Sequence, residues 1–228
     1  RVCSELSFIG GGTLNIIDHD AGTPYHSSAT IVGGTTNTIS NSYNAFIGGG
    51  NTNCITGYCG GVIGGGTCNK ICAYYNCNNA ILGGTCNTIS AYYDNSIVGG
   101  IGNTISGGYN CNSFIGGGSL NSISGNYNKN AVVVGGKFNT ASAACSFIGG
   151  GDRNQATANN AIVVGGTLNT ASVACSFIGG GCSNSISSPY SQNKFDIIVG
   201  GDNNTISNAY NSCNSTIVGG KDNTVSGP

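Results

Sequence analysis

Both histidines of the chain lie in one stretch with two aspartates, running from Asp18-His19-Asp20 to His26. Imidazole and carboxylate groups are ligands that transition metals accept, so this stretch carries the best candidate chemistry for a metal. The alternative interpretation is a polar loop between two repeats, and we favour it. We therefore predict no metal site.

The rest of the chain offers little to an enzyme. It has only 8 carboxylates beside the 2 histidines, and no Ser-His-Asp or Cys-His pairing recurs. Acid–base and nucleophilic catalysis both need such groups close together. The glycine-rich turns lack the lysine and the following helix of a phosphate-binding loop. We predict no catalytic residue, no cofactor and no enzymatic activity.

Charge is equally scarce. Charged residues make up 7% of the chain and the net charge is −1, so neither nucleic acid nor an anionic membrane surface is an expected partner. No apolar run approaches the length needed to span a membrane. The 41 glycines show no Gly-X-Y period, which excludes collagen.

One unit organises the sequence, and Ser146 to Asn154 is a clear copy of it. It reads small residue, large apolar residue, Ile or Val, Gly or Val, Gly-Gly, two free positions and Asn, followed by Thr/Ser, Ile/Ala and Ser. A regular self-similar period indicates a repeat architecture. Copies are spaced 15 to 22 residues apart, at Asn15, Asn37, Asn53, Asn69, Asn87, Asn103, Asn121, Asn139, Asn154, Asn169, Asn184, Asn204 and Asn223.

Each copy contains two short β-like pieces separated by a glycine-containing turn. Side chains alternate across a strand, so each piece carries one apolar row, and stacked coils bury these rows together. The second row, two residues after the Asn, is Ile, Ala or Val in every copy. The first row lies six residues before the Asn and consists of Ile9, Ile31, Ile47, Ile63, Ile81, Ile97, Ile115, Val133, Ile148, Val163, Ile178, Ile198 and Ile217.

The repeated Asn has the parity of the inward rows and lies at the turn. We predict an Asn ladder, with side-chain amides bonding coil to coil and Gly-Gly supplying the unusual φ values of a tight corner. The fold expected is an all-β parallel β-solenoid of the β-roll type, left-handed, with two short strands per coil and about thirteen coils. We assign residues 1–228 to one domain. A calcium-binding β-roll is the rival interpretation, and we disfavour it because the turns almost lack carboxylates.

From Ser7 to Ser226 the pattern resembles the head repeats of YadA-like trimeric autotransporter adhesins. It is also similar to the Gly-Gly-x-x-Asn-Thr-x-Ser repeats of bacteriophage and large-virus fibre proteins. The resemblance implies a parallel β-roll, often trimeric, displayed on a cell or virion surface. The chain departs from the adhesins in its longer, uneven repeats, and it shows no coiled-coil stalk or membrane anchor.

Twelve cysteines indicate an oxidising exterior, with reduced, buried cysteine as the alternative. Cys68 and Cys86 precede the ladder Asn in adjacent coils, so we expect their Cα atoms about 5 Å apart and predict a possible disulfide. Cys145 and Cys175 are also equivalent but lie two coils apart, at about 10 Å, and we predict that they do not bond.

Three surface patterns suggest contacts. Where Gly occurs five residues before the Asn, the residue seven before it is usually Phe, and where Val or Leu occurs there it is never Phe; we interpret this pattern as a packed subunit interface. The interface candidates are Phe8, Phe46, Phe114, Phe147 and Phe177. All tyrosines lie in the return segments, as an aromatic binding edge for glycan or protein or as a structural ladder. The binding-edge candidates are Tyr43, Tyr74, Tyr92, Tyr109 and Tyr127.

The third pattern consists of Thr and Ser one and three residues after the Asn, as in Thr104 and Ser106. Stacking makes them a hydroxyl lattice, and ice binding is the alternative function it suggests. Our first hypothesis is a non-enzymatic surface fibre or adhesin segment for rigid display and attachment, self-associating as a homotrimer or an end-to-end filament. Because both ends carry repeat sequence, we expect the chain to be part of something longer.

Overall fold

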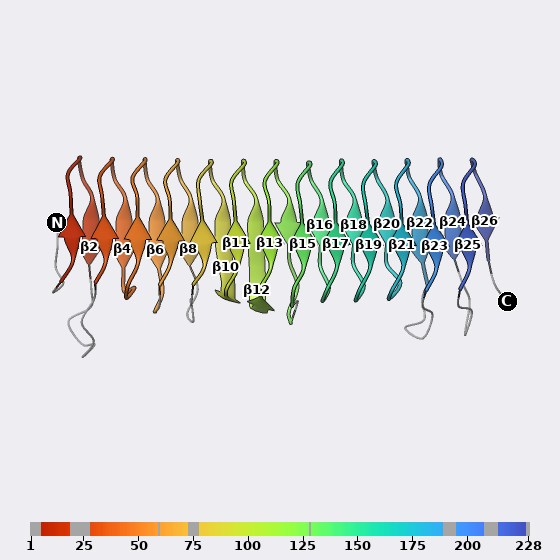
Figure 1. Ribbon diagram of the computed structural model, residues 1–228, viewed down its shortest axis with the longest axis horizontal. Helices are drawn as coiled ribbons and strands as arrows, with labels where there is room; N and C mark the ends of the chain where they lie inside the picture. The colour runs from red at the N-terminus through yellow and green to blue at the C-terminus, as the bar shows by residue number, and fades with distance from the viewer. Residues whose placement is uncertain are drawn as a thin grey trace.

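The computed structural model describes residues 6–18, 28–58, 60–72, 78–127, 129–188, 195–207 and 214–226. Within them the chain winds through two parallel sheets of thirteen strands each, and strands of the two sheets alternate along the sequence. The coils stack along one axis, with the two ends of the chain at opposite ends of the stack (Figure 1). The predicted all-β parallel β-solenoid with two short strands per coil is confirmed. Its winding sense stays a prediction.

The first sheet consists of the odd-numbered strands. Each of the thirteen is two residues long, and their bounds are β1 Phe8–Ile9, β3 Thr30–Ile31, β5 Phe46–Ile47, β7 Val62–Ile63, β9 Ala80–Ile81, β11 Ser96–Ile97, β13 Phe114–Ile115, β15 Val132–Val133, β17 Phe147–Ile148, β19 Ile162–Val163, β21 Phe177–Ile178, β23 Ile197–Ile198 and β25 Thr216–Ile217.

The second sheet consists of the even-numbered strands, which include the two longest of the described chain. Their bounds are β2 Ile16–Asp18, β4 Thr38–Ser40, β6 Cys54–Thr56, β8 Lys70–Cys72, β10 Thr88–Tyr93, β12 Thr104–Cys111, β14 Ser122–Ile123, β16 Thr140–Ala141, β18 Gln155–Ala156, β20 Thr170–Ala171, β22 Ser185–Ser187, β24 Thr205–Ser207 and β26 Thr224–Val225.

The register is the same from coil to coil, so every row predicted from the sequence becomes a column. In the first sheet Ile97 pairs with Ile81 on one side and Ile115 on the other. Backbone N–H groups donate to the following coil, as Phe8 does to Ala29 O at 3.0 Å and Gly10 to Ile31 O at 2.9 Å. The strands of both sheets keep this direction through the described stack, whereas the residue before a ladder Asn donates to the preceding coil, as Cys86 does to Thr67 O.

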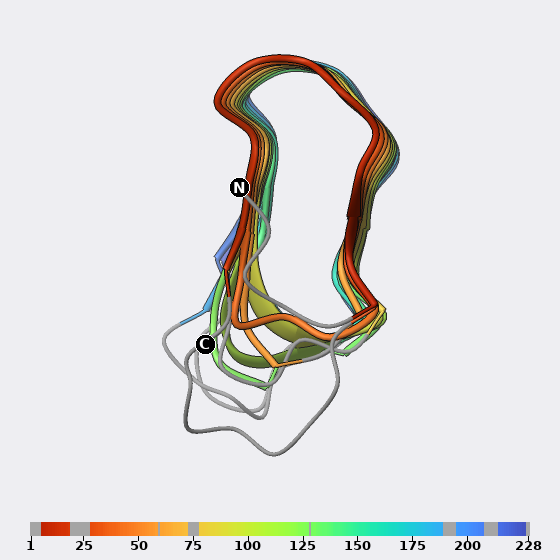
Figure 2. The same cartoon turned by 90° about the vertical axis from the view of Figure 1, so that its left-hand side faces the viewer.

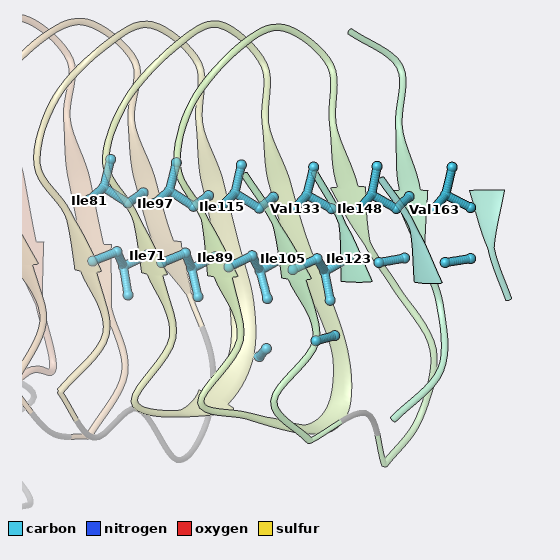
Figure 3. Close-up of a cluster of buried hydrophobic side chains, with 14 of the residues drawn as sticks. Ile71, Ile81, Ile89, Ile97, Ile105, Ile115, Ile123, Val133, Ile148 and Val163 are labelled. Atoms are coloured by element: carbon cyan, nitrogen blue, oxygen red, sulfur yellow. The ribbon is translucent and has the colours of Figure 1, made fainter. Parts of the chain in front are cut away.

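The core is the narrow space between the two sheets, where the two apolar columns face each other (Figure 3). Residues of both columns are shielded from solvent: Ile97 and Ile105, for example, are each 0% exposed. Burial of such side chains contributes about 1.5–3 kcal/mol each, and no coil could bury its own pair alone. At the first coil, Ile9 is only partly buried.

Seen end-on, the coil is an elongated ring, closed at one end by an arch whose paths superpose from coil to coil (Figure 2). The described paths at the opposite end, which we call the return side, diverge. The arch joins each strand of the first sheet to the next strand of the second and contains the Gly-Gly-x-x-Asn segment. Coil length therefore varies on the return side alone.

Candidate functional site

The Asn ladder lies inside the arch, and each amide is fully engaged. Asn103 Nδ2 donates to the Gly99 carbonyl of its own arch at 2.9 Å and to the Gly118 carbonyl of the next coil at 3.1 Å. Its Oδ1 accepts the backbone N–H of Asn121 at 2.9 Å. Because the amide uses both donors and its acceptor, neither Asp nor Leu can replace Asn here without leaving buried groups unpaired.

The same arrangement recurs through the described stack. The ladder residues of the first twelve coils are buried, which are all of those predicted from the sequence except Asn223. They are Asn15, Asn37, Asn53, Asn69, Asn87, Asn103, Asn121, Asn139, Asn154, Asn169, Asn184 and Asn204. Asn223 is exposed but keeps the contact, since its Nδ2 donates to Asn204 Oδ1 at 2.9 Å.

The position of the second glycine of the arch has no room for a side chain. Gly100 has φ +92°, and a Cβ there would stand 2.1 Å from the Gly118 carbonyl oxygen of the next coil. The position of the first glycine does have room, because a Cβ on Gly99 would have no neighbour nearer than Gly83 O at 3.9 Å. The sequence prediction assigned unusual φ values to the pair, and the structure locates the requirement at its second member.

A feature that sequence reasoning missed is the residue directly before each ladder Asn. It adopts the left-handed conformation whatever its type: φ is +56° at Cys68, +57° at Leu120 and +55° at Arg153. This conformation costs an ordinary residue about 1–2 kcal/mol. The residue type at this position varies freely, so a single sequence carries no signal for the left-handed conformation. The hydrogen bonds of the Asn ladder offset the cost of this conformation in every coil.

A second, shorter Asn ladder was also missed, at the foot of the first sheet. Asn79 and Asn95 are both 0% exposed, and Asn79 Oδ1 accepts from the backbone N–H and from Nδ2 of Asn95, at 2.9 and 3.1 Å. The Ser113 backbone N–H then donates to Asn95 Oδ1 at 3.1 Å. The available signal was an Asn eight residues before the main ladder Asn in two successive coils.

The outer face of the first sheet bears the predicted phenylalanines, and the structure explains their pairing with glycine within the chain. A Cβ on Gly149 would stand 2.3 Å from the Val164 carbonyl oxygen and 3.5 Å from Phe147 Cε1. Glycine is therefore required by the close approach of the next coil, and the Phe147 ring covers the space it leaves. The size compensation read from the sequence needs no partner chain to account for it.

The phenylalanines are unevenly exposed. Phe8 is 59% and Phe46 37% exposed, whereas Phe114, Phe147 and Phe177 are half-buried. From β13 to β23 the outward column is apolar in every coil, a surface we call the apolar column. Its residues are Phe114, Val132, Phe147, Ile162, Phe177 and Ile197.

The outer face of the second sheet carries the hydroxyl columns. Thr88 pairs with Thr104, and Ser90 with Ser106, so the hydroxyls of successive coils line up. In the neighbouring coils the array is interrupted where Cys54 pairs with Lys70. Ser172 Oγ donates to the Ile186 carbonyl at 2.9 Å, so part of the hydroxyl set is engaged by the backbone.

The return side gathers some of the predicted tyrosines. Tyr109 lies between two others: its ring is stacked on Tyr127, with centroids 4.8 Å apart and planes at 6°, and meets the edge of Tyr92 at 5.0 Å. Stacking covers ring faces, so this group resembles a structural ladder more than an open platform for sugars. Tyr43 is half-buried, and Tyr74 lies outside the described residues.

The eight described cysteines all carry free thiols. Cys68 and Cys86 are neighbours, because Thr67 and Thr85 pair in register and the Cys86 N–H donates to the Thr67 carbonyl at 2.9 Å. They are not bonded to each other in the structure, and the disulfide stays a prediction. Cys145 and Cys175 are separated by Asn160, whose N–H donates to Ala144 O at 2.9 Å, while the Cys175 N–H donates to Asn159 O at 2.9 Å.

Two thiols are less acidic than usual. The pKa of Cys86 is raised by loss of hydration, by charge repulsion from Cys68 and by a hydrogen bond with it. Burial raises the pKa of Cys54, partly opposed by the Lys70 ammonium. Neither cysteine is therefore an activated nucleophile, because nucleophilic reactivity requires the thiolate.

Two ion pairs lie in arch segments of the described chain. Arg153 forms an ion pair with Asp152 at 2.9 Å, and Lys221 with Asp202 at 3.1 Å. Asp18 ends β2, while His19, Asp20 and His26 fall outside the described residues. In the described part of the chain no three His, Cys, Asp or Glu side chains gather, and no helix is long and apolar enough to cross a membrane.

Fold and surfaces together define a parallel β-solenoid repeat protein. A scan against models of known protein families found no match, and a search of curated proteins found no similar sequence.

Proposed function

We propose that this chain is a non-enzymatic structural rod, a segment of a surface fibre or adhesin that provides rigid display and attachment. The observation that carries the proposal is the unbroken ladder of hydrogen bonds along thirteen coils. At about 4.8 Å per coil the stack is about 60 Å long. The resemblance to adhesin heads and viral fibres supports a place on a cell or virion surface.

The surface that favours attachment is the apolar column. Its outward residues from Phe114 to Ile197 form a continuous stripe. Solvated apolar stripes of this kind mark contact surfaces. We propose self-association of the chain through it, as a homotrimer, with end-to-end stacking as the other mode; surface glycans or a receptor are the partners such a fibre would engage.

Electron microscopy of the full chain tests the rod shape, and light scattering tests the self-association. The proposal expects straight rods and a particle mass that is a multiple of the single chain. Phe147→Asp should lower the mass to that of one chain, because it places a charge on the apolar column. Thr140→Asp, on the opposite outer face of an adjoining coil, is the matched control and should leave association unchanged.

Circular dichroism and thermal unfolding of both variants separate lost association from lost folding. Monomeric wild-type particles at micromolar concentration would contradict the self-association. Flexible or globular particles in the micrographs would contradict the rod itself.

Ice binding is the second candidate, favoured by the in-register hydroxyl columns. Their residues repeat about every 4.8 Å along the stack and about 6.7 Å along each strand, which makes a flat two-dimensional array. Thermal hysteresis of the wild type and its loss in Thr104→Lys would support this function. Normal ice growth in the presence of the wild-type chain would exclude it.

A further inference from the structure

The arrangement of Cys68 and Cys86 differs from that of every other cysteine in the described chain. They alone occupy equivalent positions of successive coils, both directly before a ladder Asn and both left-handed, with φ +56° and +55°. The equivalent positions in the preceding and following coils are Thr52 and Gly102, so no third thiol lies next to the pair in this column. Both side chains are exposed.

Their relationship is a translation along the stack, which sets the spacing of the side chains as well as of the backbone. Equivalent atoms of successive coils lie about 4.7–4.9 Å apart. A disulfide needs Cβ atoms about 3.5–4.5 Å apart, so direct bonding of these thiols requires a local shift. Two metal–thiolate bonds of about the 2.3 Å length known for zinc–thiolate bonds, placed end to end, span about 4.6 Å and need no such shift.

We propose that Cys68 and Cys86 form a two-coordinate site for a soft monovalent d¹⁰ cation, of the class of Cu(I) and Ag(I). Thiolates are the ligands such ions select. Zinc and calcium are poorly served, because they take four or more ligands and no group of three candidate ligands gathers in the described part of the chain.

Binding displaces the two thiol protons, because the metal ligand is the thiolate: two S–H bonds break, two S–metal bonds form and two protons pass to solvent. The pKa of Cys86 is raised first by loss of hydration, then by charge repulsion from Cys68 and a hydrogen bond with it. Because the metal ligand is the thiolate, affinity for the cation rises with pH. The site lies on the arch, away from the apolar column, and is independent of self-association.

The test uses Ag(I) alone, which needs no reductant, on the full chain under anaerobic conditions. One equivalent is added, remaining thiols are alkylated, and peptide mapping shows which cysteines were protected. The proposal expects Cys68 and Cys86 to be protected together. Cys68→Ser should weaken the tightest binding by at least about tenfold, whereas Cys145→Ser should leave it unchanged.

A variant that creates a second site is a control for the case in which Cys68→Ser loses binding because it does not fold. Asn160→Cys inserts a thiol between Cys145 and Cys175, which the native chain holds two coils apart, and so creates equivalent thiols in adjacent coils. It should bind an additional Ag(I) at comparable affinity. Protection spread evenly over the cysteines, or an unaltered tight site in Cys68→Ser, would overturn the proposal.

Discussion

The two ends of each coil follow different rules. The arch has the same length, the same glycine and the same Asn amide in all thirteen coils, and its paths superpose (Figure 2). The return side accommodates a spacing between ladder residues that varies from 15 to 22. The stack is therefore held in register at the arch, which leaves the return side free to vary in length and composition.

An insertion should expose this asymmetry most strongly. Two glycines inserted between Gly100 and Ile101 displace Asn103 from the ladder and break its bonds to two neighbouring coils, so we expect the free energy of unfolding to fall by more than about 4 kcal/mol. The same insertion between Ala158 and Asn159, on the return side, should cost about 1 kcal/mol or less, because loop closure depends weakly on length. Urea unfolding of both variants measures the difference, and equal losses would refute the asymmetry.

The glycine pair sharpens the comparison within the arch. Gly100→Ala should lower the free energy of unfolding by about 3–5 kcal/mol, since φ is +92° and the new Cβ would stand 2.1 Å from the Gly118 carbonyl oxygen. Gly99→Ala, one residue earlier, should cost less than about 1 kcal/mol. Thermal unfolding of the two variants measures both losses. A larger loss of stability in Gly99→Ala than in Gly100→Ala would contradict the geometry.

The ladder amide itself comes next. Asn103→Ala removes three hydrogen bonds of 2.9 to 3.1 Å and leaves buried backbone groups unpaired, so we expect a loss of about 2–4 kcal/mol. The return-side control, Asn159→Ala, replaces an exposed side chain and should change stability by less than about 0.5 kcal/mol. Similar urea midpoints for the two variants would show that the ladder does not hold the stack.

Much of this fold was predictable because the sequence repeats it. Every inward row and the ladder Asn recur at a fixed offset, so one register explains all thirteen copies. The short ladder of Asn79 and Asn95 occurs in only two coils and is lost among the other asparagines. The pairing of Phe147 with Gly149 was visible, but its cause, the approach of the Val164 carbonyl, belongs to the folded backbone.

The surfaces were harder to predict than the core. The register of the coils tells which residues stack in one column. The orientation of each side chain in that column depends on its neighbours in space. The tyrosines illustrate this: their common return-side placement was readable, but the stacking of Tyr109 on Tyr127, which covers ring faces, was not. The cysteines show the same limit, since spacing predicted that Cys68 and Cys86 are neighbours without deciding what they bind.

Native-state hydrogen exchange tests the central claim, a rigid stack held at its arch, most directly. The account predicts that backbone amides of the buried ladder asparagines in the middle of the stack, such as Asn103 and Asn121, exchange most slowly and with similar protection. Their N–H groups donate to the preceding Asn Oδ1 at 3.0 and 2.9 Å. Return-side amides such as Asn160 should exchange faster. Ladder amides that exchange as fast as those of the return side would contradict the account.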